Sequence, residues 1–157
     1  MKKNKINIRL RNTSTPPVKK MISLLQKSKQ KSNLPLIDLS QAVPSAPPSL
    51  SIQRVIEMGA LNPKSYRYGD ILGQPELRET IATTWNSIYK SDITSAEVGV
   101  TSGCNQAFCA TISALADEGD NIILPSPWYF NHKMWLDMAG IKTQPLICGS
   151  DMLPSPQ

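Results

Sequence analysis

The feature that most constrains this chain is an alternation of short apolar runs and helical segments in its C-terminal part. Residues 98–101, 122–124 and 141–147 predict strands, and residues 106–115 and 129–139 predict the helices between them. A β-α-β-α-β order implies parallel strands joined by right-handed helical crossovers. We therefore expect an α/β fold, in which ligands bind outside the carboxyl ends of the strands.

The residues before this pattern predict helices separated by prolines. Thr15 resembles an N-cap and Pro16 a first helical residue, so a helix is expected from there to near Lys31. Residues 50–58 predict a second helix. A longer helix is expected to start at Pro75, because apolar residues recur after it at helical spacing.

Composition and charge narrow the class of protein. With 40% hydrophobic and 18% charged residues, the 157-residue chain has the composition of one globular domain. Ten of its 17 basic residues lie in residues 1–37, which contain no acid. This basic arm has no aromatic residue on which a base could stack, and no DNA-binding pattern follows it, so we expect a solvated arm and no nucleic-acid partner.

Apolar runs and cysteines give three further expectations. No apolar run approaches the roughly 20 residues that cross a bilayer, so no membrane partner is expected. The three cysteines include no CxxC pair, which argues against a disulfide framework and against a zinc site. A cytoplasmic protein without a bound metal is the expectation.

Two segments suggest a ligand site. In VTSGCNQAF, residues 100–108, a strand gives way to a small-residue turn and then to a helix near Asn105, so backbone N–H groups and the positive helix end converge as a phosphate requires. In PSPWYFNHK, residues 125–133, Trp128 and Tyr129 follow the next strand, where a ring could lie flat on a planar heterocycle. An ordinary tight turn and a pair of core aromatics are the alternatives.

Taken together, these segments resemble the class I aminotransferases, which are fold-type-I pyridoxal 5'-phosphate (PLP) enzymes. The motifs are YRYGDILGQPELRETIA (66–82), TSGCNQA (101–107) and PSPWYFNHK (125–133), and IDLSQAVPSAPPSL (37–50) fits the entry to the small domain. The resemblance implies a partial PLP-dependent transferase fold. Its parts would be a basic arm and helix (1–33), the start of a small domain (34–64) and the first part of a PLP-binding large domain (65–157).

The resemblance also implies roles for individual residues at the cofactor. Ser102, Gly103, Cys104 and Asn105 would form the cup for the cofactor phosphate, and Tyr129 would stack on the pyridine ring. Cys104 at a helix N-terminus could instead be a low-pKa thiol, although a small residue that fills the turn is favoured.

Three more positions complete the implied site. His132 would orient the aspartate that pairs with the pyridine nitrogen. Tyr68 would reach across a homodimer interface to the phosphate of the neighbouring subunit. Ala42 would lie close to the substrate, where many relatives have glycine.

The family's Schiff-base lysine has no counterpart among these residues, since neither Lys133 nor Lys142 lies in the family's lysine motif. The resemblance therefore implies the N-terminal portion of an enzyme that transfers an amino group between an amino acid and a 2-oxo acid, and that is inactive as this chain alone. A PLP-dependent lyase or synthase and a non-catalytic remnant or interaction module remain open. An aminotransferase-like regulator is disfavoured, because residues 1–33 are too short for a DNA-binding domain.

Overall fold

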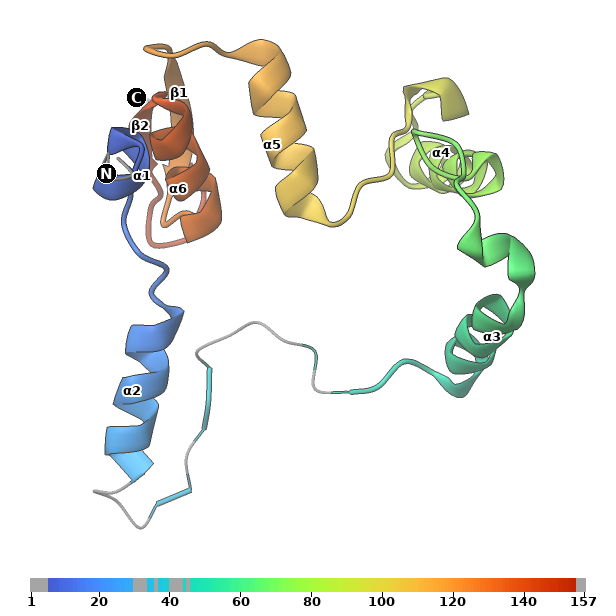
Figure 1. Cartoon of the computed structure of the whole chain (residues 1–157), viewed down its shortest axis with the longest axis horizontal. Coiled ribbons are helices and arrows are strands. Elements are labelled where there is room, and N and C mark those ends of the chain that lie inside the picture. The colour runs from blue at the N-terminus through green and yellow to red at the C-terminus, as the bar shows by residue number, and fades with distance from the viewer. Residues whose placement is uncertain (1–5, 30–33, 36, 40–43, 45, 155–157) are drawn as a thin grey trace, which may run out of the picture. The chain divides into compact units, whose positions relative to one another are not determined.

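A computed structural model describes residues 6–29, 34–35, 37–39, 44 and 46–154 of the chain. It divides into two compact units, shown together in Figure 1. We call Met1–Ser40 with Ser102–Gln157 the sheet unit and Gln41–Thr101 the helical unit. The domain boundaries expected from the sequence stay predictions.

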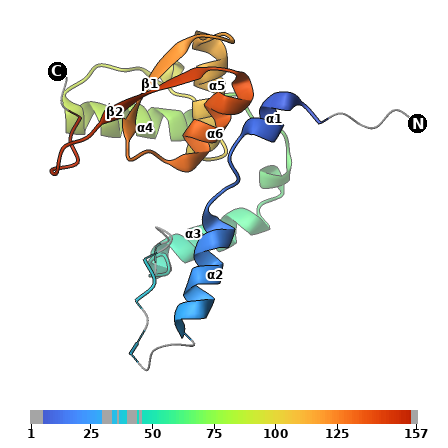
Figure 2. The same cartoon turned by 90° about the vertical axis from the view of Figure 1, so that its left-hand side faces the viewer.

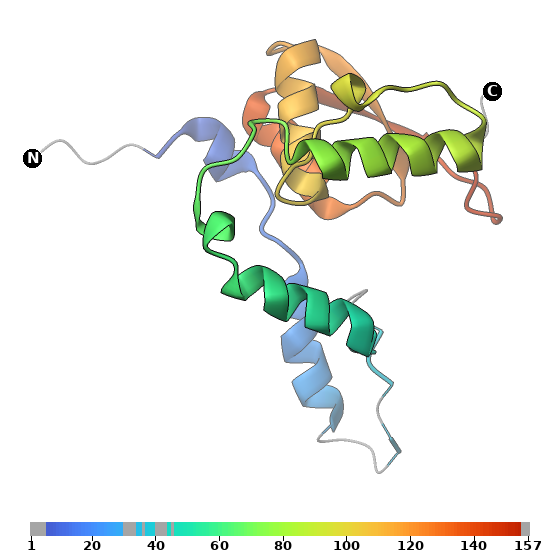
Figure 3. The ribbon, with the colours of Figure 1, turned by 90° about the vertical axis from the view of Figure 1, so that its right-hand side faces the viewer.

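The described helices of the helical unit are α3 (Leu50–Leu61), the 3-10 helix η1 (Pro63–Tyr66), α4 (Pro75–Tyr89) and the 3-10 helix η2 (Ser95–Glu97). Figure 3 shows α3, η1 and α4 in green along the chain. The predicted start of α4 is confirmed, with Pro75 in its first turn, where the missing N–H costs no helical bond. It ends at Lys90, whose φ of 56° is left-handed. The predicted second helix is also confirmed, although it runs three residues further, to Leu61.

The strand predicted at residues 98–101 is wrong. Val98 has extended angles, φ −104° and ψ 123°, but no ladder forms there. The Val100 N–H donates to the Leu72 carbonyl at 2.8 Å, which ties the segment to the loop before α4. A strand is defined by its pairing as well as by its torsion angles, and no described residue supplies a partner strand to this segment.

The sheet unit contains α5 (Cys104–Leu115), β1 (Asn121–Ser126), α6 (Phe130–Ala139) and β2 (Lys142–Ile147). The predicted parallel pairing is confirmed, in a register from Asn121 opposite Lys142 to Ser126 opposite Ile147. Between α6 and β2 the chain turns at Gly140, where φ is +77°. A left-handed residue after a helix is usually glycine, because other side chains are strained there.

The core of the sheet unit is small. Leu136 of α6 is completely buried, and Ile112 of α5, Leu124 of β1 and Ile141, the residue before β2, pack around it. Partly buried rings and methyl groups cover this cluster, among them Phe108 and Trp128. Trp128 therefore packs against the core, which was the alternative to a ring that contacts a ligand.

The N-terminal residues differ from the prediction in two ways. A short helix, α1 (Ile8–Asn12), was not expected, and it packs against α6 (Figure 2) through Arg9, which pairs with Glu118 and donates to the Ala139 carbonyl at 3.5 Å. Arg9 is therefore held against the end of α6, whereas the other residues of α1 are exposed, as expected for a solvated arm.

The predicted helix at Thr15 begins later, as α2 (Val18–Lys29). Its first backbone bond runs from the Met21 N–H to the Pro17 carbonyl at 3.0 Å, so Thr15 is not the N-cap. The reason is the double proline: Pro17 disfavours helical torsion angles at Pro16, so the helix can start only after the second ring.

Candidate cofactor site

The cup predicted at residues 102–105 is the open N-terminus of α5. Gly103 is the N-cap, with φ +82° and ψ 167°, and Cys104 is the first helical residue. The first N–H groups of a helix have no acceptor inside it, and the first turn of α5 contains no acidic side chain. A Cβ built on Gly103 would meet no atom within 4 Å, so there is open space on that side of the turn.

The side chains around this turn leave it accessible. Ser102, Gly103, Cys104 and Asn105 are all exposed. The Ser102 N–H donates to Oε1 of Gln106 at 2.6 Å, which orients the turn relative to the helix. The partial positive charge of a helix N-terminus attracts anions, and here that end faces solvent.

A row of aromatic rings connects α5 to Tyr129. Phe108 of α5 stacks on His132 of α6, with centroids 4.0 Å apart and planes 13° from parallel. His132 in turn meets Tyr129 edge-on, at 5.3 Å and 87°. Tyr129 is the N-cap of α6, and its hydroxyl accepts a hydrogen bond of 2.8 Å from Nδ2 of Asn131.

This row brings together the helix of the cup and the predicted stacking ring. Phe108 lies four residues after Cys104, about one helical turn. Tyr129 remains about half exposed, at 49%, so its ring is available to a ligand. Phe108 was not singled out from the sequence, although its spacing from Cys104 was a signal that it lies on the same face of the helix.

His132 has an unsatisfied nitrogen. Its Nε2 atom is buried and has no hydrogen-bond partner among the described residues. A buried polar atom without a hydrogen-bond partner costs free energy. A carboxylate that accepts from Nε2 would remove this cost.

The two remaining predicted residues are Tyr68 and Ala42. Tyr68 is in the loop before α4 and its side chain is fully exposed, with a relative accessible area of 106%. Ala42 lies outside the described residues.

Two other kinds of site find no support in the described part of the chain. No group of three or more His, Cys, Asp or Glu side chains there is arranged to hold a metal ion. Among the same residues, no helix combines the length and the apolar character that a membrane crossing needs.

Comparison with known proteins identifies the family. The family described as "Aminotransferase class I and II" matches residues 34–151. The chain therefore belongs to the class I and II aminotransferases, which are generally PLP-dependent enzymes. The fold class expected from the sequence is confirmed.

Curated relatives carry aminotransferase names. The aromatic aminotransferase ISS1 of Arabidopsis thaliana is 35% identical over 95 residues, which is 60% of this chain and 23% of the relative. An aspartate aminotransferase of Thermotoga maritima is 32% identical over 133 residues, 83% of this chain and 35% of the relative. This chain thus spans about a quarter to a third of the length of these relatives.

Solved structures agree on the fold. The crystal structure of aspartate aminotransferase from Thermotoga maritima matches with a TM-score of 0.77 at 26% identity, over 96% of this chain and 40% of that one. Apo-BacF from Bacillus subtilis has a TM-score of 0.82 at 22% identity, over 98% of this chain and 40% of its own, which supports the fold alone.

Proposed function

We propose that this chain supplies the phosphate cup and the stacking ring of the PLP site of an aminotransferase, which transfers an amino group between an amino acid and a 2-oxo acid. The observation that carries the proposal is the open, glycine-capped N-terminus of α5, joined to Tyr129 by the stacked rings of Phe108 and His132.

The cup suits a phosphate in charge and in shape. The backbone N–H groups of residues 103–105 and the hydroxyl of Ser102 would donate to the phosphate oxygens. A dianion at a helix N-terminus gains about 0.3–1 kcal/mol from the helix dipole, and up to about 2 kcal/mol where the site is partly buried. Gly103 fits this role because a Cβ there would occupy the space that the phosphate needs.

The two rings of α6 would hold the heterocycle. Tyr129 would lie against its face, and the bond from Asn131 would fix the angle of the phenol. Nε2 of His132 would donate to the carboxylate that pairs with the pyridine nitrogen, which gives this buried atom the partner it lacks among the described residues. When bound, PLP supplies the electron sink for carbanion formation at the substrate Cα.

A complete site would need residues that these 157 do not supply. The Schiff-base lysine would come from further polypeptide, and the full protein would be a cytoplasmic homodimer. In that dimer Tyr68, which is exposed in this chain, would donate to the phosphate of the neighbouring subunit. Ala42 would lie near the substrate. We keep the proposed boundaries of an arm at 1–33, the start of a small domain at 34–64 and the start of the large domain at 65–157.

Substitution of Tyr129 tests the cofactor assignment. In the full natural polypeptide, Tyr129→Leu should raise the PLP dissociation constant by about 3- to 10-fold, because ring stacking contributes about 0.5–1.5 kcal/mol. The matched control is Tyr89→Leu, at the exposed C-terminal end of α4, which should leave PLP binding unchanged. Equal effects of the two substitutions would contradict the assignment of Tyr129.

An assay of the chain alone tests whether these 157 residues can catalyse transamination without further residues. Incubated with PLP, an amino acid and a 2-oxo acid, it should turn over no faster than free PLP, and the remaining polypeptide added as a separate chain should restore transamination. Stoichiometric borohydride labelling of one lysine of this chain, with turnover, would contradict the proposal and point to Lys133 or Lys142.

A further inference from the structure

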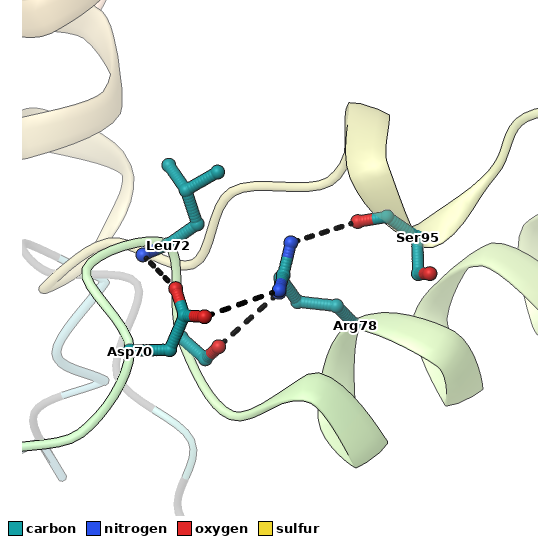
Figure 4. Close-up of polar contacts among 5 residues, drawn as sticks. Asp70, Leu72, Arg78 and Ser95 are labelled. Carbon is teal, nitrogen blue, oxygen red and sulfur yellow. Dashed lines mark hydrogen bonds and ion pairs between the residues drawn. The ribbon is translucent and has the colours of Figure 1, made fainter.

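The guanidinium of Arg78 connects three parts of the helical unit. Arg78 lies in the first turn and a half of α4, and its side chain is only 14% exposed. Nε donates to the Gly73 carbonyl at 3.2 Å and Nη1 to the Ser95 carbonyl at 3.1 Å, while Nη2 lies 3.5 Å from Oδ2 of Asp70 (Figure 4). One side chain thus joins the loop before α4 to the turn η2 that follows the helix.

Asp70 links Arg78 to the backbone of the loop. Its Oδ1 accepts the Leu72 N–H at 2.9 Å (Figure 4). Its carbonyl accepts the Gly73 N–H at 3.0 Å, so residues 70–73 form a closed turn. The carboxylate therefore binds the turn with one oxygen and Arg78 with the other.

The other side of the turn rests on Val100. The Leu72 carbonyl accepts the Val100 N–H at 2.8 Å, and a Cβ on Gly73 would come within 2.8 Å of the Val100 Cβ. The turn is therefore held between the Arg78 guanidinium and a segment that leads, two residues later in the sequence, to Ser102.

Tyr68 lies two residues before this turn. Because its ring is fully exposed, no packing against the described residues fixes its position, and the backbone of the loop must do so. We propose that Arg78 is a positioning residue, which fixes the turn at residues 70–73 and so presents Tyr68 to the PLP phosphate of the neighbouring subunit. This inference rests on the proposed function.

The geometry explains why an arginine is needed. Three acceptors lie around the planar fork, and a lysine ammonium is a single point that cannot reach all three in the same directions. Arg78→Lys keeps the charge in place but loosens the turn. Asp70→Asn keeps an acceptor for the Leu72 N–H and removes only the ion pair with Arg78.

A double-mutant cycle on PLP affinity tests the inference. The dissociation constant for PLP is measured by absorbance titration in the full natural polypeptide with Tyr68→Phe, Arg78→Lys, both or neither. Loss of a hydrogen bond to a charged phosphate predicts a rise of about 10- to 150-fold for Tyr68→Phe. Arg78→Lys should raise it by up to about tenfold in the native background, but by less than about twofold when Tyr68 is already phenylalanine.

The controls separate positioning from general destabilisation. Arg67→Lys, at an exposed arginine beside Tyr68, should leave the dissociation constant unchanged. If Arg78→Lys does not fold, Asp70→Asn takes its place in the cycle with the same expected non-additivity. The thermal midpoint of each variant records any loss of stability separately from PLP affinity.

The outcomes distinguish two kinds of failure. If Tyr68→Phe does not change PLP affinity, the proposed role of Tyr68 fails and the inference fails with it. If Tyr68→Phe weakens binding but the positioning substitution acts equally in both backgrounds, or has no effect, Tyr68 keeps its role and Arg78 has only a structural one.

Discussion

Replacement of Gly73 by alanine should be unusually destabilising for a loop position. Gly73 has φ +100°, a conformation that side chains of L-residues rarely adopt. A Cβ there would lie 2.8 Å from the Val100 Cβ and 2.9 Å from its Cγ2. Both atoms belong to a short, stiff side chain, so the neighbour cannot move aside without its backbone.

The expected cost is the sum of two effects. The left-handed backbone costs about 1–2 kcal/mol once a Cβ is present. Overpacking against Val100 costs about 1–3 kcal/mol more. Gly73→Ala should therefore lower the free energy of unfolding by about 2–5 kcal/mol, a large share of the typical stability of about 5–15 kcal/mol.

Two other glycines provide matched comparisons. A Cβ on Gly103, with φ +82° and ψ 167°, would meet no neighbour, so Gly103→Ala should show the backbone cost alone, about 1–3 kcal/mol. Gly59 lies inside α3 with open space around it, so Gly59→Ala should stabilise the protein by about 0.5–1 kcal/mol.

The assay is urea unfolding of the full natural polypeptide, followed by circular dichroism, with the three alanine variants compared through their midpoints at a common slope. The expected order of stability is Gly59→Ala, then native, then Gly103→Ala, then Gly73→Ala. If Gly73→Ala costs no more than Gly103→Ala, the close contact with Val100 does not constrain the turn, and the reasoning about the clamp at residues 70–73 is refuted.

Three further predictions concern the core, acid stability and the isolated chain. Leu136→Ala should lower the unfolding free energy by about 2–5 kcal/mol in the same urea assay, because Leu136 is completely buried, and a negligible loss would contradict the described core. Hydrogen bonds from the Thr94 backbone N–H and, to a smaller extent, from its hydroxyl hold the pKa of Glu97 below its ordinary value of 4.5. The ionised carboxylate therefore stabilises the fold above that value, and this stabilisation is lost as the pH falls through the lowered pKa. Glu97→Gln should remove that part of the acid-side loss, which falls below about pH 4.5, and an unchanged pH profile would contradict it. The chain alone should melt without a sharp transition, because much of its apolar surface is exposed, whereas a cooperative melt from a monodisperse monomer would show a self-sufficient domain.

The sequence predicted those elements whose boundaries depend on local signals. Pro75 marks the start of α4, and Gly140 ends α6, because proline and glycine act on the backbone wherever they stand. The parallel pairing of β1 with β2 followed from the helix between them. The turn at Gly103 was predicted for the same reason, since a turn between an extended segment and a helix exposes N–H groups whatever surrounds it.

The remaining features depend on contacts between distant residues. The docking of α1 requires Glu118 and the end of α6, which lie more than a hundred residues away. The absence of a strand at residues 98–101 also depends on partners, because the torsion angles of Val98 are extended as expected. Likewise, the stacking of Phe108 on His132 joins two helices, and nothing in either segment specifies the other.

The most direct test of the account is a crystal structure of the full natural polypeptide with PLP bound. We expect the phosphate oxygens within hydrogen-bond distance of the backbone nitrogens of residues 103–105, and the Tyr129 ring stacked on the pyridine ring. A phosphate bound away from the N-terminus of α5, or a Tyr129 ring on the opposite side from Gly103, would contradict the proposed site.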